Sequence, residues 1–182
     1  MAILTRRLLL LAAALFGLGA AVPLLAQTAS EDEVKAAFLF NFAKFVEWPA
    51  EALGESQKLV VGVLGDDDFA AMLEKAIAGK SAGGHSIAVE RLAVPDKDKL
   101  AACHILFVSP TQNERLGPLL ASTANTALLT VGERDEFVDR GGIIAFTVQD
   151  NKLRFSINAT AAEKARLKIS SQLTKLALRV VQ

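Results

Sequence analysis

The sequence contains no tyrosine, one tryptophan, one cysteine and two histidines among its 182 residues. Because Cys103 is the only thiol, no disulfide can form within the chain. Cys103 and His104 are neighbours, so in a strand their side chains point to opposite faces and do not ligate one metal ion. The sequence therefore predicts no internal redox bridge and no zinc centre, and we expect Cys103 to be a buried thiol.

The chain also has no formal net charge, because 20 lysines and arginines balance 20 aspartates and glutamates. A protein that binds nucleic acid usually carries a basic surface, and so does one that binds anionic lipid. Neither kind of partner is expected for this chain.

One continuous apolar run is present, over residues 8–22, directly after Arg6 and Arg7. Its length of about 15 residues falls short of the roughly 20 that span a bilayer. A basic start, a short apolar core and a small residue before a polar segment predict a signal peptide cleaved after Ala26. An uncleaved amino-terminal anchor is the alternative. We expect residues 27–182 to form a single, mildly acidic domain in the periplasm.

No catalytic fingerprint is found in the sequence. Gly83-Gly84 and Gly141-Gly142 lack the spacing of a dinucleotide- or phosphate-binding loop, and Ser109 lacks a nucleophile elbow. A phosphorylated receiver domain does not fit either, because Ser109-Pro110 stands where an aspartate would follow the third strand. We therefore expect the protein not to be an enzyme. A hydrolase with a divergent site is the weakest alternative.

Three consecutive carboxylates, Asp66 to Asp68, follow the first predicted strand, where open parallel sheets often bind ligands. They could hold a divalent cation, but the pattern favours a helix amino terminus with one capping aspartate. If the protein binds a small molecule, we expect the site in a strand-end crevice between these residues and Ser109.

Apolar periodicity alternates between strands and helices along the rest of the chain. We expect strands over residues 58–64, 86–92, 104–109 and 126–131, and helices over residues 68–78, 95–101 and 111–122. Residues 142–148 and 152–157 predict an antiparallel hairpin, and residues 170–181 a final helix. This order predicts the α/β class, with a mainly parallel open sheet flanked by helices on both faces and a C-terminal β-hairpin and helix.

The first helix is predicted over about residues 31–48, with a capping box of Ser30 and Glu33 at its start. Most of its aromatic stripe is expected in the core; the stripe consists of Phe38, Phe42, Phe45 and Trp48. Phe40 differs, because it lies on the polar face with Lys44, which favours contact with a partner or a second copy. Asn41 interrupts the apolar stripe and needs a hydrogen-bond partner if it is buried.

Residues 34–49 (VKAAFLFNFAKFVEWP) stand out near the start of this pattern, and residues 154–158 (RFSIN) with 167–173 (LKISSQL) near its end. Together they resemble the opening and closing motifs of the YfiR-like periplasmic family. Segments 61–65, 103–108 and 141–144 follow in the order of that family, so the resemblance covers essentially all of the expected mature chain.

The resemblance implies a periplasmic α/β protein without catalytic residues or a cofactor. It further implies a homodimer that binds the periplasmic sensory part of an inner-membrane diguanylate cyclase, or another membrane sensor protein, and represses it. Cyclic di-GMP signalling and biofilm formation would then fall. Redox control through disulfides, also implied, does not fit the single Cys103. The alternative function is a periplasmic sensor domain that binds a small molecule and has another membrane partner.

Two groups of candidate site residues follow from these motifs. Phe40 and Lys44 are the predicted contacts with a partner or a second copy. The candidates for a polar pocket or for helix capping are Asn41, Trp48, Asn158, Ser170 and Ser171. No residue is assigned to catalysis or to metal binding.

Overall fold

The computed structural model describes residues 29–54 and 57–182, so the predicted signal peptide and its cleavage after Ala26 lie outside the described residues. The helices are α2 (Glu31–Phe45), α3 (Asp67–Ile77), α4 (Lys97–Ala102), the 3-10 helix η1 (Pro110–Arg115), α5 (Leu116–Thr123), α6 (Glu136–Asp139), α7 (Ala159–Lys164) and α8 (Ser171–Leu176). The strands are β1 (Val46–Glu47), β2 (Leu59–Leu64), β3 (Ser81–Ala82), β4 (His85–Leu92), β5 (Ile105–Val108), β6 (Leu129–Glu133), β7 (Ile144–Gln149), β8 (Lys152–Asn158), β9 (Lys168–Ile169) and β10 (Arg179–Val181).

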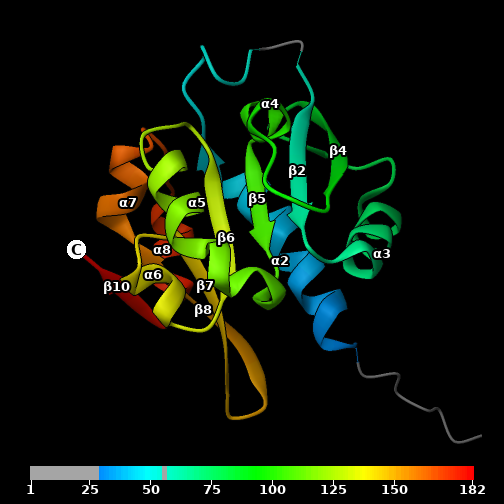
Figure 1. Cartoon of the computed structure of the whole chain (residues 1–182). Helices are drawn as coiled ribbons and strands as arrows, with labels where there is room; N and C mark the ends of the chain where they lie inside the picture. The colour runs from blue at the N-terminus through cyan, green and yellow to red at the C-terminus, as the bar shows by residue number, and fades with distance from the viewer. Residues whose placement is uncertain (1–28, 55–56) are drawn as a thin grey trace, which may run out of the picture.

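An eight-stranded sheet runs through the centre of the molecule in the order β10-β8-β7-β6-β5-β2-β4-β3 (Figure 1). β2 pairs in parallel with both β4 and β5, and β6 and β7 extend the parallel run. β8 returns antiparallel to β7, and β10 lies parallel to β8. The predicted α/β class with a mainly parallel sheet is therefore confirmed.

Helices cover both faces of the sheet, with α2 behind it and α5 in front of it in Figure 1. Alternate residues of each buried strand feed two apolar clusters, as the two-residue period of a strand requires. On the α2 side, Val63 and Phe107 pack with Leu39 and Leu73. On the α5 side, Leu106 packs with residues of α5 and α6. Burial on both faces is the reason that β2 and β5 are almost wholly apolar.

The hairpin of β7 and β8 is confirmed, with Gln149 opposite Lys152. Only two residues connect the strands, Asp150 and Asn151, with φ of 51° and 55°. Positive φ at both central positions is the conformation of a type I′ turn, which matches the twist of the flanking strands.

Two predicted helix boundaries are wrong. α2 begins with the predicted capping box of Ser30 and Glu33 but ends at Phe45, because Val46 is extended and pairs with β9. The final helix, predicted over residues 170–181, covers only Ser171–Leu176, and the chain then extends as β10. The helix predicted over residues 111–122 is present as η1 and α5. The change from one to the other falls at Leu116, and not at Gly117-Pro118, so that Pro118 lies in the first turn of α5.

Candidate functional site

The two motifs at the ends of the chain meet in space. β1 pairs antiparallel with β9, which places Val46 opposite Ile169, and the Ser170 amide donates to the Phe45 carbonyl at 2.9 Å. One turn earlier on α2, the ring of Phe42 packs edge-on against that of Phe155, with centroids 5.4 Å apart. The opening motif is therefore held by both parts of the closing motif.

The buried face of α2 consists of Lys35, Ala36, Leu39, Phe42 and Ala43. Of the predicted aromatic stripe only Phe42 is fully buried, whereas Phe38, Phe45 and Trp48 are partly exposed and pack at the edge of the core. The buried stripe of α2 is therefore rotated from the predicted one and includes the small side chains of Ala36 and Ala43.

Phe40 is half-buried, and two ammonium groups lie over its ring. The Lys80 Nζ is 5.2 Å from the ring centroid, and the Lys44 Nζ is 5.7 Å from it. Both lysines are exposed, and within the described residues neither forms an ion pair with a carboxylate. The result is a small basic patch with an aromatic floor, made of Phe40, Lys44 and Lys80.

Trp48 lies just after β1 and donates from Nε1 to the His104 carbonyl at 3.2 Å. The His104 imidazole is buried and connects two other segments: its Nδ1 accepts from the Val60 amide at 3.1 Å, and its Nε2 lies 3.1 Å from the Ala52 carbonyl. Because Nδ1 accepts, the proton is on Nε2, which donates to Ala52. Burial lowers the pKa of His104, with the bond to Ala52 opposing the shift and His85 adding to it.

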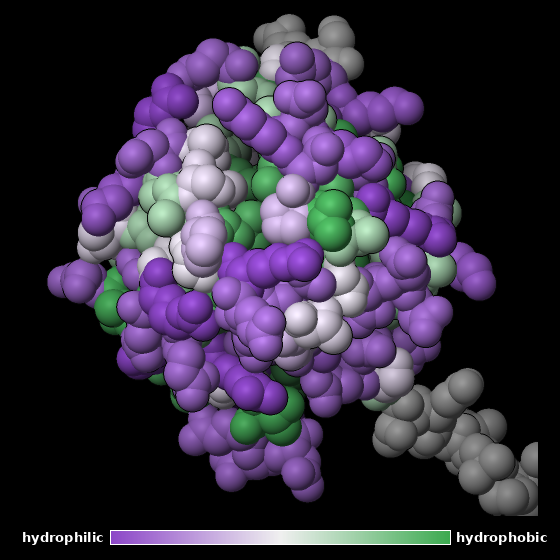
Figure 2. Space-filling model, in the orientation of Figure 1, coloured by the Kyte–Doolittle hydropathy of each residue, from purple (hydrophilic) through white to green (hydrophobic). Residues whose placement is uncertain are grey.

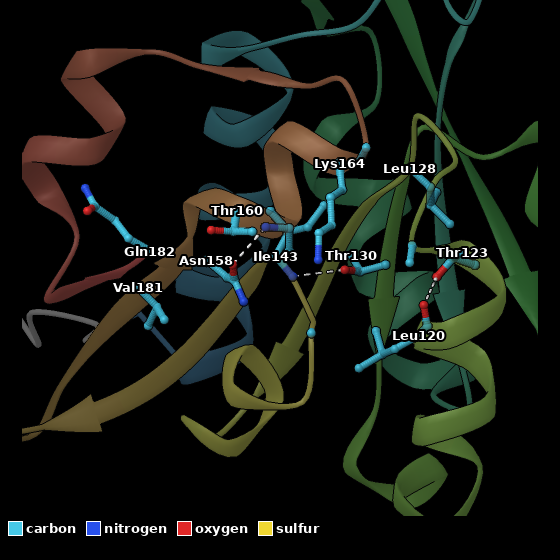
Figure 3. A pocket seen from close by; sticks show the side chains of 14 residues that line it. Leu120, Thr123, Leu128, Thr130, Ile143, Asn158, Thr160, Lys164, Val181 and Gln182 are labelled. Carbon is cyan, nitrogen blue, oxygen red and sulfur yellow. Dashed lines mark hydrogen bonds between the residues drawn. The ribbon is translucent and has the colours of Figure 1, made fainter.

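Asn158 joins three segments around a hollow of about 270 Å³ (Figure 3). Its Oδ1 accepts from the Ala161 amide at 2.8 Å and so caps α7, while its Nδ2 donates to the Val138 carbonyl at 2.9 Å. Figure 3 shows Lys164 pointing from α7 into this hollow, toward Thr130. The Thr130 hydroxyl accepts from the Ile143 amide at 3.1 Å.

The remaining candidates are spread over the molecule. Ser170 caps α8 by accepting from the Leu173 amide at 3.2 Å, and Ser171 is exposed in the first turn of α8. Asn41 is half-buried, and within the described residues its side chain makes no hydrogen bond to the protein. The five candidate pocket or capping residues therefore do not line one common pocket.

The strand-end crevice near Asp66 is filled by the protein itself. Asp66 caps α3 by accepting from the Phe69 amide at 2.9 Å. Thr111 donates from its hydroxyl to the Gly65 carbonyl at 3.1 Å, and the Gln112 side chain also packs over Gly65. Across residues 29–54 and 57–182, no three histidine, cysteine or acidic side chains are arranged to hold a metal ion.

A larger cavity, of about 860 Å³, lies at the opposite end of the strands, next to the amino-terminal ends of β2, β5 and β6. In Figure 2 it is the hollow with green, apolar walls in the upper part of the molecule. Cys103 lies in its wall and is buried, as predicted. Sequence reasoning missed this cavity, because its walls come from segments that are separate in the chain and no single motif marks it.

Lys35 is a second feature that sequence reasoning missed. Its Nζ is 2.9 Å from a Glu31 carboxylate oxygen and 3.1 Å from one of Glu133. Burial lowers the pKa of Lys35, but hydrogen bonds and charge attraction from Glu31 and Glu133 outweigh it, so the net pKa is raised. Lys35 thereby ties the start of α2 to the end of β6.

The fold and these sites define a three-layer α/β domain whose polar side chains mainly cap helices and join segments. The family model described as YfiR/HmsC-like matches residues 32–178, and the chain belongs to this family. The family is periplasmic and regulatory rather than catalytic. No curated protein matches the chain. Among the described residues, none of the helices has the length and apolar character needed to cross a bilayer.

Proposed function

We propose that this protein is exported to the periplasm, where it binds the sensory part of a membrane diguanylate cyclase and represses the enzyme. The family match over residues 32–178 carries the proposal. The predicted signal peptide agrees with it, because the chain would then meet only the part of the cyclase outside the inner membrane.

Repression of this kind needs no chemistry by the repressor. A protein that binds the inactive conformation of the cyclase more tightly than the active one shifts the population toward the inactive form. A difference of about 1.4 kcal/mol in binding free energy changes the ratio of the two forms tenfold. A signal that removes the repressor would release the enzyme and raise cyclic di-GMP.

The patch of Phe40, Lys44 and Lys80 is the surface that we propose for the contact. Its two ammonium groups interact with the aromatic ring at 5.7 Å and 5.2 Å and remain available to carboxylates of a partner. Aromatic side chains and basic groups at the centre of an interface often carry much of its binding energy. The partner segment would therefore be acidic, with an apolar side chain that reaches Phe40.

Deletion of the gene tests the function in cells. We expect cyclic di-GMP and biofilm mass to rise on deletion and to return when the wild-type chain is supplied. Supplying a chain without residues 1–26 should fail to restore repression, because the protein would stay in the cytoplasm. Unchanged cyclic di-GMP on deletion, together with no membrane sensor protein recovered on the purified protein, would overturn the proposal.

The contact surface is tested by reversing its charge. Lys44→Glu with Lys80→Glu should weaken binding to the isolated sensory part of the cyclase about tenfold or more, as measured by calorimetry. Lys152→Glu, an exposed lysine at the start of β8, is the matched control and should bind like the wild type. Equal binding by both variants would exclude this patch from the cyclase contact.

The same variants address the homodimer that we also propose. Light scattering gives the molar mass of wild type and variants. Loss of the dimer in the variant with Lys44→Glu and Lys80→Glu would place the patch between the two copies instead. A monomeric wild type at micromolar concentration would contradict the homodimer.

A further inference from the structure

The cavity of about 860 Å³ between α4 and α5 has the size of a ligand site, since pockets for small molecules typically measure 300–1,000 Å³. Its walls are formed by apolar side chains, among them Val60, Leu100, Ala101, Ala127 and Leu128. Figure 2 shows these apolar walls open to the surface. The cavity is thus accessible from outside and suited to an apolar body.

The hydroxyl and thiol groups in the walls already have partners within the protein. The Ser122 and Thr123 hydroxyls donate to the Leu119 carbonyl at 2.8 Å and 3.0 Å, and the Thr126 hydroxyl donates to the Thr123 carbonyl at 2.8 Å. The Cys103 thiol donates to the Lys99 carbonyl at 3.2 Å. These walls leave few donors for a polar ligand, and a ligand that fills the cavity must therefore be mainly apolar.

Among the described residues at the rim of the cavity, the charged side chains without an ion-pair partner are basic. Lys58 and Lys97 line the mouth and are exposed, and within the described residues neither forms an ion pair with a carboxylate. The acidic group at the same rim, Glu51, is paired with Arg166 at 2.6 Å. An anionic head is therefore attracted to the rim, whereas a cationic head is repelled.

We propose that this cavity binds an amphipathic anion, with an apolar body inside and one carboxylate between Lys58 and Lys97. Aliphatic carboxylates of medium length have this chemistry. The site is distinct from the basic patch around Phe40, and binding to it does not depend on the proposed repression of a cyclase. If both hold, the anion is a candidate signal, because the cavity wall includes His104, which holds Trp48 of the opening motif.

Calorimetry on the protein purified from the periplasm tests the site with three probes that share an eight-carbon chain and differ in the charge of the head group: octanoate, octanol and octyltrimethylammonium. We expect octanoate to bind at least tenfold more tightly than octanol, and the cation to show no binding. Lys58→Gln with Lys97→Gln should lower the affinity for octanoate to that for octanol, while the affinity for octanol stays unchanged. Equal binding of all three probes by the wild type, or no binding of octanoate, would overturn the proposal.

The location is tested by filling the cavity. Ala101→Phe adds a ring from the exposed side of α4 and should reduce octanoate affinity at least tenfold. Ala121→Phe, exposed on α5 and not part of the cavity wall, is the matched control and should bind octanoate like the wild type. Unchanged affinity in Ala101→Phe would place the binding elsewhere and refute the assignment. Thermal unfolding of both variants checks that each is folded, and the lysine variants test the site without altering the core.

Discussion

His104 connects several segments of the chain, which the sequence around it does not indicate. Its carbonyl accepts from the Leu129 amide and from the Trp48 indole, its amide donates to the Val60 carbonyl, and its ring bridges Val60 and Ala52. In the sequence it is only a histidine at the start of an apolar strand. Its role comes from long-range contacts, which a single sequence does not reveal.

The His104 imidazole makes stability depend on pH. Its folded-state pKa is lowered from 6.5, chiefly by burial, so the unfolded chain binds the proton more tightly. Its contribution is therefore fully present above about pH 6.5 and is lost as the pH falls through the folded-state pKa. Protonation of Nδ1 also breaks the bond from the Val60 amide. We expect the free energy of unfolding in urea to fall between pH 7.5 and pH 5.

His104→Gln and His85→Gln separate this effect from general acid sensitivity, because the chain has only these two histidines. The His104→Gln variant should be less stable at pH 7.5 and should lose less stability on acidification than the wild type. The His85→Gln variant should keep most of the wild-type slope, because burial, and not the charge of His85, is the main cause of the lowered pKa of His104. If the slope persists in His104→Gln and disappears in His85→Gln, the assignment to His104 is wrong.

At the scale of elements, the alternation of strands and helices was predictable but several ends were not. α2 ends where Val46 finds a strand partner in β9, more than 100 residues later in the chain. On the final helix predicted over residues 170–181, Leu173, Leu176 and Val180 would form one apolar stripe. In the structure Leu176 and Val180 are 67% and 39% exposed. The stripe faces solvent there, and pairing of β10 with β8 replaces the helix. Local periodicity carries no information about such distant partners.

The packing of α6 on the sheet depends on two glycines. The Phe137 ring lies directly against Gly132 on β6 and Gly142 before β7, in the space that a Cβ would occupy at either position. We expect Gly132→Ala and Gly142→Ala each to destabilise the protein by about 1–3 kcal/mol through overpacking. Urea unfolding monitored by circular dichroism measures both.

Gly117→Ala is the control for these substitutions, since a Cβ there meets only the end of the Arg140 side chain, at 3.6 Å. It lies in α5 and should raise stability by about 0.5–1 kcal/mol. Replacing Phe137 by leucine should reduce the cost of Gly132→Ala. A cost that is the same with either residue at position 137 would show that the ring is not its cause.

For the molecule as a whole, the fold class and the family were predictable, because burial on both sheet faces and the end motifs leave clear sequence patterns. The cavity was not predictable, because its walls combine residues from β2, α4, α5 and the loop before β6. The burial of Lys35 was not predictable either, because its partner Glu133 is 98 residues away in the sequence. The two apolar clusters hold this assembly together without any covalent link between segments.

A change of redox conditions should therefore leave the folded protein unchanged. Burial raises the pKa of the Cys103 thiol from 9.0 to about 11, with Glu90 adding to the shift and Lys99 opposing it. At neutral pH the reactive thiolate is then about 100-fold less populated than that of an ordinary cysteine. We expect Ellman's reagent to label the native protein at least 100-fold more slowly than the urea-unfolded chain, and the melting temperature to be equal with and without dithiothreitol. A covalent dimer on a non-reducing gel, or rapid labelling of the native protein, would show that Cys103 is exposed to redox chemistry.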